Sequence, residues 1–364
     1  MNAPATVLIM AAGTGGHVFP ALSIARALQA KATHIEWLGT PNGMENELLS
    51  GTGIPLHQIT VSGLRGSGLK RKLMAPIMLV SAFAQSFSLL RKIQPDCVLG
   101  MGGFVCGPAG IAAKLLGKPL ILHEQNAVAG LTNKLLAVFA DRVLEAFPNT
   151  FKPGPKLRCT GNPLRKEIAQ LHGLTQSKKV NGQRINILVL GGSQGAAAIN
   201  DVMPEVLQSL GSDAVSIVHQ TGKQKLEQSI TGYEKAGFTL SDSLKVSSFI
   251  EDMPQAYAWC DLVICRSGAS TVTEIAAVGK PSILIPYPYH RDDQQVFNAR
   301  WLSDVGAAII MRQQDLSAES LSQKIRELIS DSSSLEKMGE NARAVAVLDA
   351  DMVIANECLG LANA

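Results

Sequence analysis

Short runs of hydrophobic residues alternate along this chain with longer stretches of helical spacing. The first run covers residues 6–12, and a glycine-rich turn at 13–17 leads from it into a helical pattern near Pro20. Short apolar runs bounded by turn residues are typical of strands that are buried on both faces of a sheet. Further runs of this kind occur at 35–38, 97–100, 119–122 and 142–145. The alternation predicts a parallel sheet covered by helices on both faces.

The second half of the chain begins the same pattern again. Residues 185–190 form a buried-strand run, and the glycine-rich segment 191–195 follows it directly. Later runs lie at 216–220, 245–249, 262–265 and 282–286. We therefore predict an α/β fold in which two Rossmann-like domains, each a doubly wound parallel sheet, face a cleft.

Two segments mark where the predicted domains join. Residues 160–163 are turn formers that can begin a linker, and the stretch 341–361 has helical spacing and can cross back to the first domain. The first domain is thus expected to comprise 1–162 with 341–364, and the second 163–340. A length of 364 residues fits two domains better than one.

Composition limits the partners and the compartment. Aromatic residues make up 5% of the chain, which argues against a stacking surface for single-stranded nucleic acid. The six cysteines form no CxxC pair, so neither a zinc site nor a disulfide framework is predicted. Residues 1–6 lack a basic segment followed by an apolar core, so no signal peptide is predicted. We expect a reduced cytosolic protein without nucleic-acid partners.

Charge is unevenly distributed along the chain. Residues 1–162 contain 15 Lys and Arg against 7 Asp and Glu, a net charge of +8, whereas residues 163–364 have a net charge of −5. The first half is therefore expected to meet an anionic partner. Its segment 62–72 is glycine-rich and basic, an uncharged run follows at 73–90, and two further basic residues end that run at 91–92.

Two interpretations of the segment 62–92 are open. It can form an apolar surface with a basic rim that rests on an anionic membrane. Alternatively, it is a mobile loop followed by a core helix. Pro76 and several polar residues make the run 73–90 a poor membrane span in either case.

Polar and glycine-rich clusters follow three of the predicted strands in the first half. They are GTGGH at 13–17, the turn at 101–108 and HEQN at 123–126. Because the carboxyl ends of parallel strands meet at one edge, these clusters would line one crevice. Position 18 is Val, so the GxGxxG dinucleotide code fails, and the GxxxxGK[ST] phosphate loop is absent as well.

The segment 262–295 carries the clearest candidate ligand site. A buried strand at 262–265 leads through small residues into a helix at 269–278, whose exposed amides and dipole suit a phosphate. Glu274 lies one to two turns further in, where its carboxylate could bind a ribose diol. Gln294 and Gln295 offer amides of the kind that bind sugar hydroxyls. Many similar strand–helix units bind nothing, so this segment alone does not decide the function.

Six motifs occur together in order along the chain: GTGGHVFP at 13–20, GMGGF at 100–104, HEQN at 123–126, GNP at 161–163, GGSQG at 191–195 and RSGASTVTE at 266–274. This combination resembles the MurG family of bacterial N-acetylglucosaminyltransferases over nearly the whole chain. The resemblance implies the GT-B fold, which consists of two Rossmann-like domains with a C-terminal helix that returns to the first.

The resemblance also implies an activity and a location. The donor would be UDP-N-acetylglucosamine (UDP-GlcNAc), and the acceptor would be lipid I, undecaprenyl-diphosphoryl-N-acetylmuramoyl-pentapeptide. Transfer with inversion would give lipid II for peptidoglycan synthesis, and hence for cell shape and cell division. The enzyme would need no cofactor. It would be a peripheral protein on the cytoplasmic face of the inner membrane, with other cell-wall synthesis proteins as further candidate partners.

The substrate-binding positions that match the family are Thr14, Gly15, Gly16, Asn126, Arg165, Ser193, Ile250, Ala269, Ser270, Thr271, Val272, Thr273, Glu274 and Gln294. Ile250 would contact uracil through its backbone. The chain departs from the family at Ala12, where Gly is usual, and in the segment 288–293. The second departure leaves open whether Gln294 or Gln295 contacts the sugar.

Inversion needs a base that takes the proton of the acceptor 4-hydroxyl. His17 is the first candidate, and Glu124 is the alternative. Backbone amides at Ser193 and 267–270 would stabilise the leaving UDP electrostatically. No DxD-like motif in a metal-holding context is found, and Asp292–Asp293 is the one acidic pair that raises the question, so no metal is expected.

Three other functions compete with this one. An NAD-dependent oxidoreductase would share the two-domain fold, but the broken GxGxxG code argues against it. A soluble sugar-nucleotide epimerase would also share the fold, but it would not need the basic and apolar segment 65–92. A non-enzymatic membrane scaffold would not bind UDP.

Overall fold

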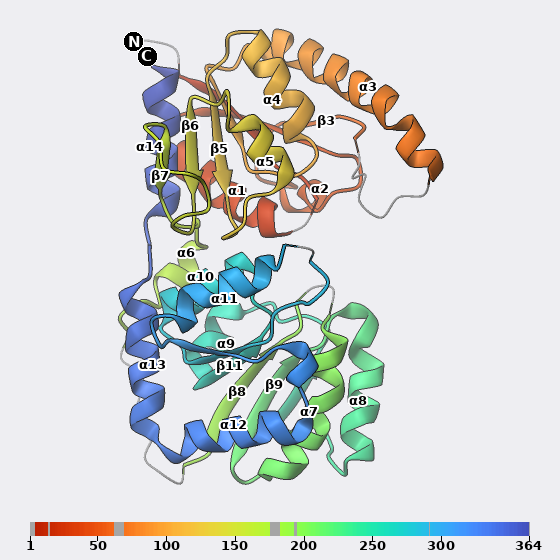
Figure 1. Ribbon diagram of the computed structural model, residues 1–364, viewed down its shortest axis with the longest axis vertical. Helices are drawn as coiled ribbons and strands as arrows, with labels where there is room; N and C mark the ends of the chain where they lie inside the picture. Colours follow the sequence, from red (N-terminus) through yellow and green to blue (C-terminus); the bar gives the residue numbers. More distant parts are fainter. Residues whose placement is uncertain are drawn as a thin grey trace. The chain divides into compact units, whose positions relative to one another are not determined.

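The computed structural model describes residues 4–13, 15–61, 69–174, 183–192, 195–290 and 292–363, with the side chains of 69–74 and of Ser332 excepted. The chain divides into two compact units (Figure 1). Unit 1 comprises Met1–Arg165 and Val347–Ala364, and unit 2 comprises Lys166–Ala346. The chain therefore passes from one unit to the other twice.

Unit 1 is built on a parallel sheet in the order β3-β2-β1-β4-β5-β6-β7. The order runs outward in both directions from the first strand, as in a doubly wound sheet. The strands are β1 (Thr6–Met10), β2 (His34–Gly39), β3 (Leu56–Gln58), β4 (Cys97–Gly100), β5 (Leu120–Glu124), β6 (Arg142–Glu145) and β7 (Leu157–Cys159).

Helices cover both faces of this sheet, as the continuous apolar runs predict. Because side chains alternate along a strand, Val7 and Ile9 lie in one core cluster and Leu8 and Met10 in another. The first cluster includes residues of α1 and α14, and the second includes residues of α3 and α4. The helices of unit 1 are α1 (Gly15–Gln29), α2 (Glu45–Leu48), α3 (Leu69–Ile93), α4 (Cys106–Leu115), α5 (Leu131–Leu136) and α14 (Ala350–Ala362).

Unit 2 contains a second parallel sheet, in the order β10-β9-β8-β11-β12-β13. Its strands are β8 (Ile185–Leu190), β9 (Val215–Gln220), β10 (Leu244–Ser247), β11 (Leu262–Cys265), β12 (Ser282–Leu284) and β13 (Ala308–Ile310). Its helices are α6 (Lys166–Ala169), α7 (Ala197–Leu210), α8 (Leu226–Lys235), α9 (Met253–Trp259), α10 (Ala269–Val278), α11 (Gln294–Ser303), α12 (Ala318–Ser330) and α13 (Ser332–Ala344). The two-domain α/β architecture predicted from the sequence is thus confirmed.

The C-terminal return differs in detail from the expectation. The stretch 341–361 has helical spacing throughout, but it falls in two helices: α13 ends at Ala344 in unit 2, and α14 begins at Ala350 in unit 1. The helix is interrupted because the chain leaves one unit and enters the other between them. In unit 1, α14 packs against α1 and β4 (Figure 1). Glu357 of α14 also pairs with Arg142 at 3.5 Å and with Arg158 at 3.7 Å.

Candidate active site

The polar loops of unit 1 gather at the carboxyl ends of three neighbouring strands, β1, β4 and β5. Gly102 and Gly103, in the loop after β4, both have positive φ angles, of 92° and 83°. A Cβ atom added at Gly102 would lie 3.2 Å from Cε1 of His17, in the first turn of α1. The His17 ring therefore packs against a glycine turn that leaves little room for a side chain.

His17 is half-buried, and its Nδ1 lies 2.6 Å from Oε1 of Gln125. Gly15 and Gly16 begin the same helix, and Gly16 is exposed. Thr14 lies outside the described residues. The fold thus brings the first glycine loop and the HEQN segment into direct contact, which places His17 at the edge of the sheet where ligands of such folds bind.

The carboxylate of Glu124 is buried and holds its own loop together. Its Oε1 accepts hydrogen bonds from N and Nδ2 of Asn126, at 3.1 and 3.2 Å. Its Oε2 accepts from N of Gly130 at 3.0 Å and from Nδ2 of Asn133 at 2.9 Å. Four donors therefore engage both oxygens. This arrangement favours a structural role for Glu124, including the orientation of Asn126, over the role of base.

Glu45 is a buried carboxylate that sequence reasoning missed. It accepts hydrogen bonds from N of Gly13 at 3.1 Å and from N of Thr40 at 2.7 Å, so it holds the first glycine loop. A Cβ at Gly39 or Gly43 would lie 2.6 or 2.0 Å from its side chain. In the sequence, the glycines on either side of 40–42 were the only indication of this contact. The structure shows that they leave room for the Glu45 side chain.

In unit 2, the start of α10 has the features of an anion site. The helix begins at Ala269 after Gly268, and Ser270 Oγ is buried with no hydrogen-bond partner among the described residues. The first amides of a helix of this length lack intrahelical acceptors and carry its positive partial charge. Thr273 donates instead to the carbonyls of Ala269 and Ser270, and the Val272 side chain is buried. The side chains of Thr273 and Val272 therefore support the helix, and the backbone of the first turn is the part suited to bind a phosphate.

Glu274 is oriented by a residue that sequence reasoning missed. The hydroxyl of Tyr257, in α9, donates a hydrogen bond of 3.1 Å to Oε2 of Glu274. Burial, with the nearby Glu274 charge, raises the pKa of Tyr257 well above its usual value, so this phenol stays a donor. The contact fixes the carboxylate at a position one turn from the anion site.

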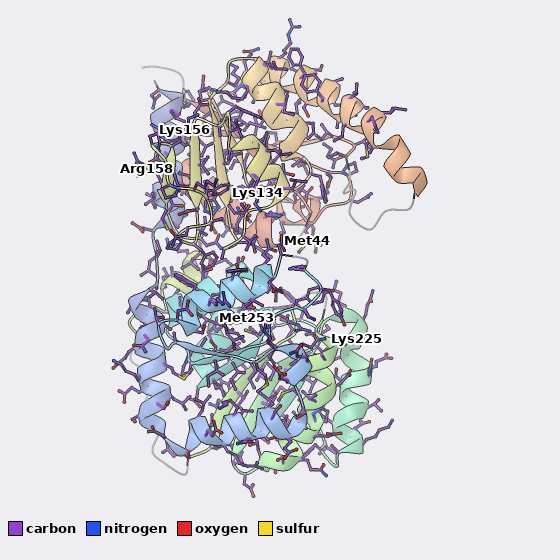
Figure 2. All side chains as sticks on the ribbon, in the orientation of Figure 1. Met44, Lys134, Lys156, Arg158, Lys225 and Met253 are labelled. Atoms are coloured by element: carbon purple, nitrogen blue, oxygen red, sulfur yellow. The ribbon has the colours of Figure 1, made fainter. Side chains whose placement is uncertain are left out.

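The glycine loop after β8 also approaches the backbone closely. A Cβ at Gly191 would lie 2.9 Å from O of Gln220, and one at Gly195 would lie 2.6 Å from O of Thr221. Cγ of Lys225 lies 3.3 Å from that second position, so the aliphatic part of a lysine not singled out from the sequence packs beside the loop; Lys225 is labelled in Figure 2. Ser193 lies outside the described residues.

Ile250, expected to bind uracil through its backbone, already has a partner. Its N–H donates a hydrogen bond of 3.1 Å to Oε1 of Gln220, which is buried. A uracil oxygen would therefore compete with Gln220 for this amide.

Gln294 and Gln295 are the first two residues of α11, and the contacts of Gln295 indicate its role. Oε1 of Gln295 accepts a hydrogen bond of 2.9 Å from N of Tyr287. The backbone carbonyl of Gln295 accepts a second, of 2.7 Å, from Oγ of Ser267. Gln295 therefore fixes the loop before α11, while Gln294 is the first residue of α11.

Arg165, another predicted substrate-binding residue, is the last residue of the first segment of unit 1. Within the described part of the chain, no group of three or more His, Cys, Asp or Glu side chains could hold a metal ion.

Two Rossmann-like units with glycine-rich loops at the carboxyl ends of their strands are the architecture of the GT-B class of glycosyltransferase folds. Residues 7–145 match the glycosyltransferase family 28 N-terminal domain, and residues 186–359 match the family 28 C-terminal domain. The chain belongs to glycosyltransferase family 28.

Similar proteins cover the whole chain. A UDP-N-acetylglucosamine–N-acetylmuramyl-(pentapeptide) pyrophosphoryl-undecaprenol N-acetylglucosamine transferase of Azotobacter vinelandii is 47% identical, over 99% of both chains. The protein of that name from Pseudomonas syringae pv. syringae is also 47% identical, again over 99% of both chains. Among solved structures, MurG of Acinetobacter baumannii has a TM-score of 0.80 and 41% identity, and the match covers 98% of this chain and 100% of that one.

A more distant structure bears on the choice between functions. A putative UDP-N-acetylglucosamine 2-epimerase from Listeria monocytogenes has a TM-score of 0.68 at 15% identity, over 97% of this chain and 95% of that one. At such low identity the likeness concerns the fold alone. The fold is therefore shared by transferases and at least one epimerase-type protein, and the choice between them depends on the site residues and on the closer relatives.

Proposed function

We propose that this protein transfers N-acetylglucosamine from UDP-GlcNAc to lipid I with inversion, which gives lipid II for peptidoglycan synthesis. The observation that carries the proposal is the 47% identity to transferases of that name over 99% of the chain. Each unit contributes residues that suit part of the chemistry. The α10 amides and the β8 glycine loop suit the UDP diphosphate, Glu274 suits the ribose, and His17 suits the role of base.

A direct assay separates this function from its alternatives. UDP-GlcNAc labelled in the sugar is incubated with the protein and a soluble lipid I analogue. The expected result is label in the acceptor and stoichiometric UDP. Epimerisation of the donor without acceptor would instead identify an epimerase, and binding of UDP without any turnover would leave a non-catalytic role.

Replacement of Glu274 by alanine should weaken UDP binding by about 1–3 kcal/mol, the range for a lost hydrogen bond to a charged group. The reason is the position of its carboxylate, held by Tyr257 near the start of α10. Isothermal titration calorimetry with UDP measures the effect. Glu319→Ala, which removes an exposed carboxylate from α12, is the control and should bind UDP as the wild type does. Equal affinity of the Glu274 variant would remove Glu274 from the site.

We further propose that the protein acts at the cytoplasmic face of the inner membrane and that unit 1 provides the contact. Among the described residues, no helix is long and apolar enough to cross a membrane. Ile77 and Val80 of α3 are nonetheless 64% and 68% exposed, and Arg91 and Lys92 at the end of α3 are exposed as well. Exposed apolar side chains beside basic ones suit shallow insertion into an anionic bilayer. The neighbouring basic segment 62–68 lies outside the described residues, as do the side chains of 69–74.

Exposed apolar side chains also occur on α5, which is linked to α3 through α4. α3 packs against α4, and α4 packs against α5. On α5 and just after it, Leu131, Leu135 and Val138 are 63%, 61% and 78% exposed. Lys134, also on α5, is exposed and is labelled in Figure 2. These residues enlarge the surface that we propose for membrane contact.

The protein should bind anionic vesicles, and high salt should release much of it. Each basic residue near such a surface contributes about 1 kcal/mol, which salt screens. Lys70→Glu with Lys72→Glu, and separately Ile77→Ser with Val80→Ser, should weaken binding without changing UDP affinity. Co-sedimentation at low and high salt measures this, with Leu240→Ser in unit 2 as the control for loss of an exposed leucine. If both double variants sediment like the wild type at each salt, the segment is only solvated surface.

A further inference from the structure

Four groups of unit 1 form one continuous line of hydrogen bonds that ends at the proposed base. The backbone carbonyl of Gly161 lies 3.0 Å from Nε2 of His123. Nδ1 of His123 lies 2.9 Å from the side-chain nitrogen of Gln125, and Oε1 of Gln125 lies 2.6 Å from Nδ1 of His17. None of these contacts was singled out from the sequence, although all four residues lie in its motifs.

The chemistry of the first group fixes the direction of every bond in the line. A carbonyl oxygen only accepts, so Nε2 of His123 must carry a hydrogen. His123 is fully buried, and this burial lowers its pKa to about 4, so the ring is neutral at pH 7 and its Nδ1 accepts. The NH₂ group of Gln125 must then face His123.

The orientation of the Gln125 amide has a second, independent support. Its nitrogen also donates a hydrogen bond of 3.0 Å to the backbone carbonyl of His123. Both hydrogens of the NH₂ group are thus directed to acceptors on His123, and the amide oxygen faces His17. Because that oxygen only accepts, Nδ1 of His17 carries the hydrogen. In the neutral ring, Nε2 of His17 then has the lone pair.

The line is held rigidly at each member. Gln125 is 1% exposed and His123 is 0% exposed. Their backbone carbonyls accept hydrogen bonds from Asn162 and Asn133, at 3.2 Å each. Gly161 has a φ of +77°, and a Cβ there would lie 2.7 Å from Cβ of Val347, so the carbonyl that starts the line depends on a glycine in this conformation.

We infer that Gln125 and His123 are positioning residues that hold His17 in the tautomer whose Nε2 can take a proton. The inference rests on the proposed function, in which His17 is the base. In that reaction, the acceptor 4-hydroxyl gives its proton to Nε2 while its oxygen bonds to the anomeric carbon and the bond from that carbon to UDP breaks. His17 becomes an imidazolium whose Nδ1–H remains bound to Gln125.

The first test does not depend on activity. Long-range ¹H–¹⁵N correlation spectra of the ¹⁵N-histidine-labelled protein identify which ring nitrogen is protonated, and His17→Ala assigns the His17 signals by their loss. The expected result at pH 8 is a protonated Nδ1 for His17 and a protonated Nε2 for His123. The opposite tautomer at His17 would overturn the inference, whether or not the protein transfers sugar.

The second test uses two substitutions of Gln125. Gln125→Leu removes the acceptor and should lower kcat by about 10-fold to 10²-fold, less than loss of the base itself, with KM for UDP-GlcNAc unchanged. Gln125→Glu keeps an acceptor and adds a negative charge, which favours the imidazolium. The acid limb of its pH–rate profile should therefore move to higher pH by about 1 unit or more, with activity recovered above that limb.

A matched control lies at the opposite end of β5. Asp141 accepts a hydrogen bond from N of Leu120 and pairs with Lys114, so Asp141→Ala also removes partly buried polar contacts from unit 1. It should change stability without moving the pH profile. Equal pH profiles for Gln125→Glu and wild type, in folded protein, would overturn the inference even if sugar transfer is confirmed.

Discussion

Replacement of His17 by alanine is expected to reduce the turnover number for sugar transfer by about 10²–10⁴, the usual contribution of a general base. The physical reason is the loss of the nitrogen that takes the acceptor proton. UDP affinity should hardly change, because the residues that we propose to bind the diphosphate and the ribose all lie in unit 2, whereas His17 lies in unit 1. Steady-state kinetics with a lipid I analogue and calorimetry with UDP measure the two quantities.

The control for this variant is His34→Ala, which removes a histidine paired with Glu36 in the same unit. That substitution should leave turnover near the wild-type value. A His17→Ala protein that also turns over normally would show that another group takes the proton.

Replacement of Glu124 by alanine is expected to lower the free energy of unfolding by about 3–5 kcal/mol. A donor left without an acceptor in a buried or part-buried place costs about 1–3 kcal/mol. N of Asn126 and N of Gly130 lose the Glu124 carboxylate, and Nδ2 of Asn133 keeps only the carbonyl of His123. Urea denaturation followed by circular dichroism measures the loss in the transition of unit 1. The neighbouring Glu145 offers a graded comparison, because its buried carboxylate accepts from only two of the recorded donors, Asn149 and Phe151. Its alanine variant should lose roughly half as much.

This second prediction also decides between the two candidate bases. A Glu124→Ala protein with wild-type stability but turnover lowered as far as that of His17→Ala would assign the base to Glu124. Loss of stability, with turnover recovered wherever the protein is folded, would confirm the structural role that its four hydrogen bonds indicate.

The sequence was sufficient for the features that depend on local pattern. Continuous apolar runs such as 262–265 correspond to central strands, because a strand buried on both faces needs apolar side chains at every position. The strands β3, β7 and β13 gave no such signal, because each has only three residues and most of these are partly buried or exposed. The interruption between Ala344 and Ala350 could not be predicted either, since it reflects a change of unit rather than a helix-breaking residue.

The candidate site divides in the same way. The glycine loops and the start of α10 could be located because each follows directly on a buried-strand run, at the strand end where ligands of such folds bind. Glu45 and Tyr257 could not, because each acts through a partner that is distant in sequence: Gly13 is 32 residues from Glu45, and Glu274 is 17 residues from Tyr257. Likewise, the sequence allowed both His17 and Glu124 as the base. Only the hydrogen bonds of the Glu124 carboxylate and of the His17 ring distinguish the two candidates. The roles that we assign to the site residues, including Thr14 and Ser193, stay predictions.

The line from Gly161 to His17 also limits the route by which the enzyme can discharge its proton. A proton wire needs members that can each accept on one side and release on the other, but a backbone carbonyl and a neutral amide release none at pH 7. His123, with its pKa near 4, cannot store the proton either. In the mechanism that we propose, the proton that Nε2 of His17 takes therefore leaves from the same nitrogen. Each catalytic cycle would then end when Nε2 passes that proton to an acceptor outside this line of hydrogen bonds.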